Sequence, residues 1–279
     1  METEIVKTLK YFDHFMYPPT FDEVWIFLGK SSSKEKLKRY LDKMVESGDV
    51  VVECIGGNRY ALQVSEEILN KYKRRYSHSI KLIEKSLFVL NNLKMVPMIK
   101  YLGFSGSLAM KNASTKSDID LFVITESGSV WMMRFIILVY KHIIIIINNE
   151  IGKALCLNLL FAADGLTLRK TKQNDYIAHE LLQLKTVFDK GSYLQKLQLE
   201  NIWLTKFFPN VQIKVTDVDA IGSSLRHSKA MIIIEKIVRY IQVWWLRRKK
   251  LKFVEFGAQL WLIQDDYERK ILGRVGRKH

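Results

Sequence analysis

The chain is poor in the residues that mark small disulfide-bonded or disordered proteins. It contains 2 cysteines and 4 prolines among 279 residues. Cys54 and Cys156 lie far apart in apolar runs, which predicts buried free thiols in a reducing compartment rather than a disulfide or a metal site. Because 48 % of the residues are hydrophobic, we expect a globular protein with a sizeable core, as two domains or one domain with additions.

Targeting and membrane-spanning patterns are also lacking. The first residues, "METEIVKTLKYFDHF", do not have the basic-then-apolar order of a signal peptide. The most apolar window, residues 131–148, reads as a buried helix, although its "HIIIII" has strong β propensity. Arg134, Lys141 and His142 interrupt it, so it falls short of the roughly 18 uncharged residues of a membrane span. We therefore expect a cytoplasmic, soluble protein with no transmembrane segment.

Several enzyme signatures are absent as well. The 6 histidines show no metal-ligand spacing, and neither G-x-S-x-G nor G-x-x-x-x-G-K occurs. These absences argue against zinc hydrolases, serine hydrolases of the nucleophile-elbow type and P-loop NTPases.

Acidic residues are scarce relative to basic ones. The 29 Asp and Glu against 44 Lys and Arg give a formal net charge of +15. Such a balance favours nucleic acid, nucleotides or acidic membrane surfaces as partners, and it also occurs in generally basic proteomes.

Two of the few aspartates lie one residue apart in "DIDLFVIT", where Asp118 and Asp120 flank Ile119. Residues alternate along a strand, so both carboxylates leave the same face and repel each other unless a cation lies between them. A divalent metal such as Mg²⁺ or Mn²⁺ is the expected ligand, and a solvated edge face is the alternative. Upstream, Gly106 and Ser107 form a turn in which backbone N–H groups and a hydroxyl can approach a phosphate.

The order of predicted elements divides the chain into three parts. Residues 1–64 read as three helices and a hairpin around "GGN", the order of a winged helix-turn-helix. Residues 65–170 read as a long helix followed by a small mixed-sheet α/β (α+β) core. Residues 171–279 read as a helical C-terminal region. The basic third helix makes nucleic acid a candidate partner of the first part, with protein docking as the alternative.

The "GS" turn, about ten intervening residues and "DID" together resemble the signature of the DNA polymerase β-like nucleotidyltransferase superfamily. The segments "CLN", "AHELLQL", "NIWLTKFFPN" and "DDYERKIL" resemble prokaryotic nucleotidyltransferase-domain proteins with a winged-helix front. The resemblance implies that Asp118 and Asp120 hold the metal and that Gly106 and Ser107 bind the phosphates of an NTP. It also implies transfer of a nucleoside monophosphate to a hydroxyl of RNA, protein or a small molecule, with release of pyrophosphate. Basic side chains nearby in sequence are candidates for neutralising the triphosphate: Lys111, Lys116 and Arg134.

One position departs from that signature. The superfamily supplies a third carboxylate from a later strand, and the matching catalytic position here holds Asn158, which cannot act as a general base. Asp164, if the strand is shifted or bulged, and Glu126 are possible substitutes, and a buried strand amide is the alternative role for Asn158. This departure keeps two other hypotheses open: a catalytically degenerate regulator that binds nucleic acid, and a protein-scaffolding module.

A basic and aromatic helix is expected near residues 224–250, with Trp244 and Trp245 beside Arg247 and Arg248. Stacking of nucleic-acid bases and docking at a membrane interface are both compatible with this pattern. The simplest expectation is that the tryptophans lie in the core and the basic residues in solvent.

Overall fold

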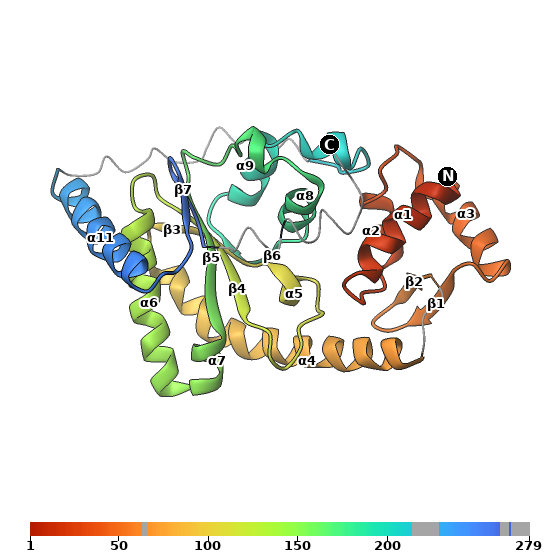
Figure 1. The fold of residues 1–279 in the computed structure, drawn as a ribbon, viewed down its shortest axis with the longest axis horizontal. Helices are drawn as coiled ribbons and strands as arrows, with labels where there is room; N and C mark the ends of the chain where they lie inside the picture. Colours follow the sequence, from red (N-terminus) through yellow and green to blue (C-terminus); the bar gives the residue numbers. More distant parts are fainter. Residues whose placement is uncertain (63–65, 214–228, 263–267, 269–279) are drawn as a thin grey trace.

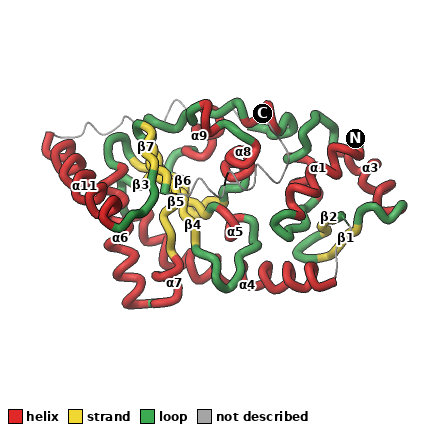
Figure 2. The backbone as a smooth tube through the Cα atoms, in the orientation of Figure 1, coloured by secondary structure: helices red, strands yellow, loops and turns green. Residues whose placement is uncertain are grey.

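The computed structural model describes residues 1–62, 66–213, 229–262 and 268. Its centre is a mixed six-stranded sheet in the order β6-β3-β4-β5-β8-β7. Figure 2 shows these strands in yellow, among red helices. The strands are β3 (Ile99–Phe104), β4 (Ile119–Thr125), β5 (Leu155–Ala162), β6 (Lys185–Asp189), β7 (Val254–Phe256) and β8 (Gln259–Trp261). β4 and β5 are parallel and the other neighbours are antiparallel. The predicted mixed α/β class is therefore confirmed.

The first 62 residues form a unit with a core of its own. Its elements are α1 (Glu2–Asp13), α2 (Phe21–Ile26), α3 (Lys34–Glu46), β1 (Val51–Cys54) and β2 (Asn58–Ala61). Thr20 and Glu23 cap α2 reciprocally, because the Thr20 hydroxyl accepts from the Glu23 N–H and the Glu23 carboxylate accepts from the Thr20 N–H. The three helices and the hairpin thus occur in the predicted order. Cys54 is exposed and Cys156 partly exposed, so the prediction of buried thiols was wrong.

A long helix, α4 (Glu66–Leu90), joins this unit to the sheet and continues into the 3₁₀ turn η1 (Asn91–Met95). Tyr72 of α4 packs edge-on against Tyr17 of the N-terminal unit, with ring centroids 5.6 Å apart. Further along α4, the Ser79 hydroxyl accepts from the Ala113 N–H at 2.9 Å. The same helix therefore supports the N-terminal unit and the loop that precedes β4.

Helices cover both faces of the sheet (Figure 1). On one face lie α4, α6 (Val130–Ile147), α7 (Asn149–Ala154) and α11 (Lys229–Arg248), with Leu121 and Val123 of β4 in their apolar core. Phe122 and Ile124 point to the other face, where the elements are η2 (Lys170–Lys172), α8 (Asp175–Leu182), α9 (Tyr193–Glu200) and α10 (Leu204–Phe207). The short helix α5 (Gly106–Ala109) lies beside β4, and its Leu108 packs in the core of the first face. Alternation along β4 places Asp120 on this second face.

The prediction that residues 171–279 are helical was wrong for three segments. β6 pairs with β3, and β8 pairs with β5 and β7, so the sheet takes strands from this region as well as from residues 65–170. These strands are 3 to 5 residues long, too short for a clear two-residue period. Most of the "DDYERKIL" segment, residues 265–272, lies outside the described residues.

The apolar window at residues 131–148 forms α6, as predicted, but only one side of this helix is buried. Among the described residues, α6 is the only helix long and apolar enough to cross a membrane. It packs against α7, α11 and β5, as expected of a helix that belongs to the fold.

Candidate active site

The turn after β3, the start of β4, the middle of β5 and the helix α8 meet at one cavity of about 580 Å³. Its wall includes Gly106, Ser107, Asp120 and Asn158, which the sequence analysis selected. His14, Phe15 and Met16 of the N-terminal unit form part of the opposite wall. The lining residues therefore place the cavity between the sheet and the N-terminal unit. Figure 1 shows α5 and α8 in this part of the molecule.

Strand pairing places the Gly-Ser turn directly against Asp120. The Ser105 N–H donates to the Asp120 carbonyl at 2.9 Å, just beyond the β3–β4 ladder. Gly106 has a φ of +58°, and a Cβ added there would lie 2.8 Å from Oδ2 of Asp120. Glycine is therefore required both by the backbone conformation and by the close approach of the carboxylate.

We expect Gly106→Ala to disturb the site more than an equally strained glycine elsewhere. Gly257, in the β7–β8 turn, also has a φ of +58° but has nothing within 4 Å of an added Cβ. Each alanine costs about 1 kcal/mol of unfolding free energy through backbone strain, and only Gly106→Ala also displaces Asp120. Urea denaturation and Mn²⁺ binding measured on both variants distinguish these effects. Equal loss of Mn²⁺ binding in the two variants would contradict this account of Gly106.

The two aspartates differ in their surroundings. Asp118 is exposed and precedes β4, whereas Asp120 is partly buried within it. Burial, and to a lesser extent the charge of Asp118, raise the pKa of Asp120 to about 6, although a hydrogen bond from the Asn158 side chain opposes the shift. A nearby cation would stabilise the ionised form of a carboxylate in these surroundings.

Asn158 lies at a bulge in β5. Leu121 pairs with Leu157 and Phe122 with Leu159, so Asn158 is an extra residue in β5. Its carbonyl accepts from the Leu262 N–H at 2.8 Å, and its side-chain oxygen accepts from the Cys156 thiol at 3.4 Å. Because Leu157 packs on the opposite face, alternation along β5 places the Asn158 amide on the face of Asp120, where it hydrogen-bonds to that carboxylate.

Glu180 of α8 is the site residue that the sequence analysis missed. It lines the cavity, and its carboxylate accepts a hydrogen bond from the Gly106 N–H. Burial is the largest cause that raises its pKa to about 7, followed by the charge of Asp120. The segment "AHELLQL" contains no motif that marks Glu180 as a site residue. Only the packing of α8 on the sheet brings Glu180 to the turn.

Neither of the predicted substitutes for the third carboxylate is near the cavity. Glu126 follows the opposite end of β4, where its buried carboxylate lies 2.5 Å from Nζ of Lys100. Asp164 is exposed beyond the same end of β5, since Thr125 pairs with Ala162. Glu126 and Asp164 both lie at the end of the sheet far from Asp120, so the expectation that one of them could replace the third carboxylate was wrong despite the bulge in β5.

The basic side chains near the Gly-Ser turn differ in their position relative to the cavity. Lys111 follows α5 with its Nζ 5.6 Å from the centre of the Tyr76 ring, and Lys116 is exposed in the loop before Asp118. Arg75 of α4, which the sequence analysis did not assign to the site, lines the cavity.

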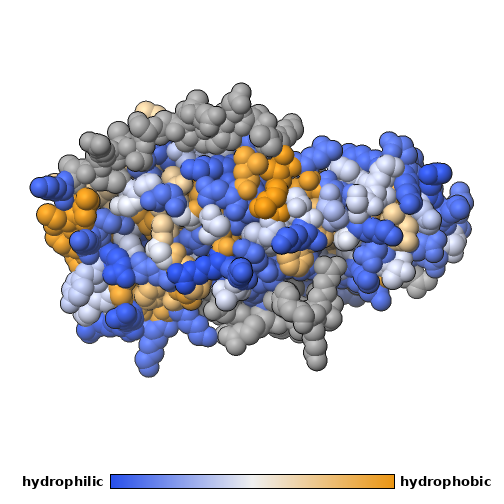
Figure 3. Space-filling model, turned by 90° about the horizontal axis from the view of Figure 1, so that it is seen from above, coloured by the Kyte–Doolittle hydropathy of each residue, from blue (hydrophilic) through white to orange (hydrophobic). Residues whose placement is uncertain are grey.

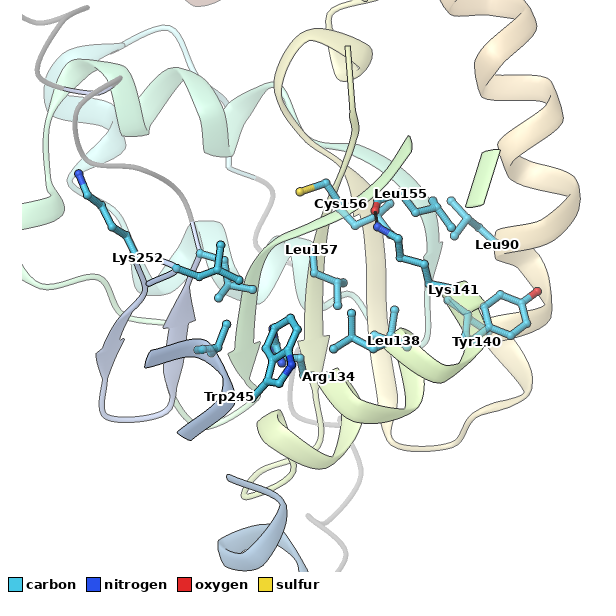
Figure 4. A pocket seen from close by; sticks show the side chains of 16 residues that line it. Leu90, Arg134, Leu138, Tyr140, Lys141, Leu155, Cys156, Leu157, Trp245 and Lys252 are labelled. Atoms are coloured by element: carbon cyan, nitrogen blue, oxygen red, sulfur yellow. Dashed lines mark hydrogen bonds between the residues drawn. The ribbon is translucent and has the colours of Figure 1, made fainter. Parts of the chain in front are cut away.

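The structure does not bring Arg134 to this site. Arg134 lies in α6 on the other face of the sheet, where it lines a separate apolar cavity of about 300 Å³ with Leu157 and Trp245 (Figure 4). Its guanidinium donates to the Gln242 side chain, and burial lowers its pKa to about 10. Proximity in sequence was misleading here, because α6 crosses to the opposite face after β4.

The N-terminal unit is tied to the rim of the cavity. The Asn112 side chain donates to the Phe15 carbonyl at 2.8 Å, so the loop after α5 is held against the end of α1. The site is consequently formed by both units and not by the sheet alone.

Within the described part of the chain, no group of three or more His, Cys, Asp or Glu side chains is arranged to hold a metal ion. The cavity wall carries the carboxylates of Asp120 and Glu180 and the amide of Asn158, while Asp118 is exposed just before β4. No family model, no curated protein and no solved structure matches this chain. The functional interpretation therefore depends on the geometry of the site and on the residues that form it.

Proposed function

We propose that the protein is a Mg²⁺-dependent nucleotidyltransferase that transfers a nucleoside monophosphate from an NTP to a hydroxyl acceptor and releases pyrophosphate. The observation that carries the proposal is the contact between the Gly106 turn and Asp120, where an added Cβ would lie 2.8 Å from the carboxylate. A turn that can bind phosphate and a carboxylate that can bind metal are thereby adjacent, as a metal–triphosphate complex requires.

The residues present fit a magnesium ion. Asp118 and Asp120 would hold it, with water and nucleotide oxygens as the remaining ligands. The raised pKa of Asp120 supports this assignment, because its partly buried carboxylate has the Asn158 amide and no cationic side chain among the groups that shift it. When bound, the ion would supply neutralisation of the phosphate charge and activation of the acceptor hydroxyl.

Phosphate binding, positioning of the Asp120 carboxylate and proton transfer are assigned to other residues of the protein. Ser107 and the backbone of the turn would orient the phosphates, and Arg75 on the cavity wall would supply positive charge. Lys111 and Lys116, in the loop between the turn and Asp118, would be further cations for an NTP that extends out of the cavity. Asn158 would hold the Asp120 carboxylate in position. Glu180 would accept the proton of the acceptor hydroxyl, since its pKa of about 7 suits a general base at neutral pH.

The acceptor belongs to one of three classes: RNA, a protein side chain or a small molecule. The net charge of +15 and the exposed basic residues of α3 favour RNA. The three helices and hairpin of residues 1–62 would act as a winged helix that presents such an acceptor to the cavity.

A second candidate function is a nucleic-acid-binding regulator with a catalytically degenerate site. Asn158, in place of a third carboxylate, is the observation that favours it. This function predicts Asp-dependent NTP binding and salt-sensitive duplex binding without turnover.

The test incubates the purified protein with each α-³²P-labelled NTP, Mg²⁺ or Mn²⁺, and total cellular RNA and protein. The Asp118→Ala/Asp120→Ala double variant is the control. Label transferred by the wild type alone supports the enzyme, and the labelled species names the acceptor class. Absence of transfer despite Asp-dependent NTP binding would favour the regulator instead.

A further inference from the structure

Unlike an ordinary surface helix, α11 exposes an apolar stripe as well as packing apolar side chains against the core. Five large side chains at helical spacing are between 53 and 74 % exposed: Ile233, Ile237, Tyr240, Ile241 and Trp244. Trp245, beside them, is 43 % exposed. The expectation that the tryptophans of this helix lie in the core was therefore wrong. Exposed apolar stripes of this kind mark contact surfaces.

The buried side of α11 packs Leu246, Val238 and Val243 into the apolar core and is also anchored to α6 by polar side chains. The Glu235 carboxylate accepts from the Trp131 and Met132 N–H groups at 2.7 and 2.8 Å, which caps the N-terminus of α6. The Gln242 side chain donates to the Trp131 carbonyl at 2.8 Å and accepts from Arg134. Rotation of α11 to bury its apolar stripe would break all of these hydrogen bonds, so the exposure is built into the fold.

The partner helix α6 exposes an apolar stripe as well. Its side chains that are at least 45 % exposed are Phe135, Val139, Ile143, Ile146 and Ile147. Both helices lie at the end of the molecule opposite the N-terminal unit (Figure 1), where hydrophobic side chains gather on the surface (Figure 3). We call the exposed residues of α6 and α11 named above the apolar face.

Basic residues adjoin this face. Arg247 and Arg248 end α11, Lys249 and Lys250 follow, and all four are exposed. The Arg248 guanidinium lies 5.4 Å from the centre of the Trp244 ring. Glu235, the one acidic residue of α11, is engaged at the N-terminus of α6. Aromatic rings thus lie between an apolar stripe and a cationic cluster, an arrangement that suits the boundary between headgroups and acyl chains.

The charge and composition of the apolar face and its basic cluster distinguish between three kinds of partner. Nucleic acid would use the cations and the tryptophans but would leave the isoleucines in water. A second copy would bring its own +15 charge and basic cluster to the same region. An anionic lipid surface matches both parts, since acyl chains cover the isoleucines and headgroups meet the cations. We propose that the apolar face docks the protein peripherally on an anionic phospholipid membrane.

The experiment is cosedimentation of the full chain with phosphatidylcholine vesicles containing either no or 30 % phosphatidylglycerol. The wild type should bind the anionic vesicles at least tenfold more tightly than the neutral ones, and 0.5 M salt should weaken binding. Ile237→Asn/Trp244→Ser should lower the affinity at least tenfold, and Arg247→Gln/Arg248→Gln on the order of tenfold. Ile202→Asn is the matched control, because Ile202 is 59 % exposed and lies between α9 and α10.

Three results would overturn the proposal. One is wild-type protein that stays in the supernatant with anionic vesicles, and another is equal binding by wild type and Ile237→Asn/Trp244→Ser. The third is a dimer, seen by light scattering, that this double variant dissociates and that binds no vesicles, since the face would then belong to a second copy. None of these results bears on nucleotidyl transfer, so this inference and the proposed function are tested separately.

Discussion

Asp120→Asn is expected to reduce label transfer from NTP by about 10³-fold or more, because it removes the partly buried carboxylate that would hold the metal. The substitution preserves the shape of the side chain and its contact with Asn158 and Gly106, so the fold should be retained. The measurement is the initial rate of transfer at saturating NTP, with thermal unfolding of both proteins to confirm folding.

Asp164→Asn is the matched control for that substitution. Asp164 is an exposed aspartate beyond the far end of β5, and its replacement should leave the rate within a factor of two. Equal rates for wild type and Asp120→Asn would show that this carboxylate is not part of the catalytic site.

Glu180→Gln is expected to lower the transfer rate by roughly 10²- to 10⁴-fold while NTP binding is retained, because glutamine cannot accept a proton. The wild-type rate should rise with pH through about 6 to 7, as Asp120 and Glu180 lose their protons. The variant should lose the part of this rise near pH 7. Glu84→Gln, at an exposed position on α4, is the control and should behave as the wild type. A variant with a normal rate and pH profile would exclude Glu180 as the base.

The same substitution has a predictable effect on stability. The folded-state pKa of Glu180 lies above its ordinary value, so the stability that this group contributes is present below about pH 4.5 and is lost as the pH rises through about 7. Without divalent metal, the wild-type free energy of unfolding should fall by on the order of 2 kcal/mol from pH 5 to pH 8. Urea denaturation in EDTA should show a weaker dependence in Glu180→Gln.

Elements that are determined by short sequence patterns were predicted correctly from the sequence. The Gly56–Gly57 turn of the N-terminal hairpin was correctly placed from the sequence, because turn residues that are neighbours along the chain determine it. β4 and β5 were also recognised, since long apolar runs indicate central strands. By contrast, β7 and β8 have 3 residues each and become strands only by pairing at the edge of the sheet.

The candidate site shows the same division. Gly106, Ser107 and Asp120 were selected together because they match one short signature by resemblance, and strand alternation supports the placement of the aspartate. Glu180 lies far along the chain and reaches the turn only through the packing of α8. Arg134 is nearer in sequence to Asp120 but on the opposite face of the sheet. Distance along the chain from Asp120 was therefore a poor guide for both residues. It suggested that Arg134 is near the site and gave no indication that Glu180 is.

The most direct test of the metal–nucleotide site is electron paramagnetic resonance of Mn²⁺ titrated into the protein with and without NTP. The account predicts that NTP tightens Mn²⁺ binding to the wild type, and that Asp118→Asn/Asp120→Asn abolishes this effect while Asp164→Asn preserves it. Identical Mn²⁺ spectra for the wild type and the double variant in the presence of NTP would contradict the account, because the paired aspartates would then hold no metal.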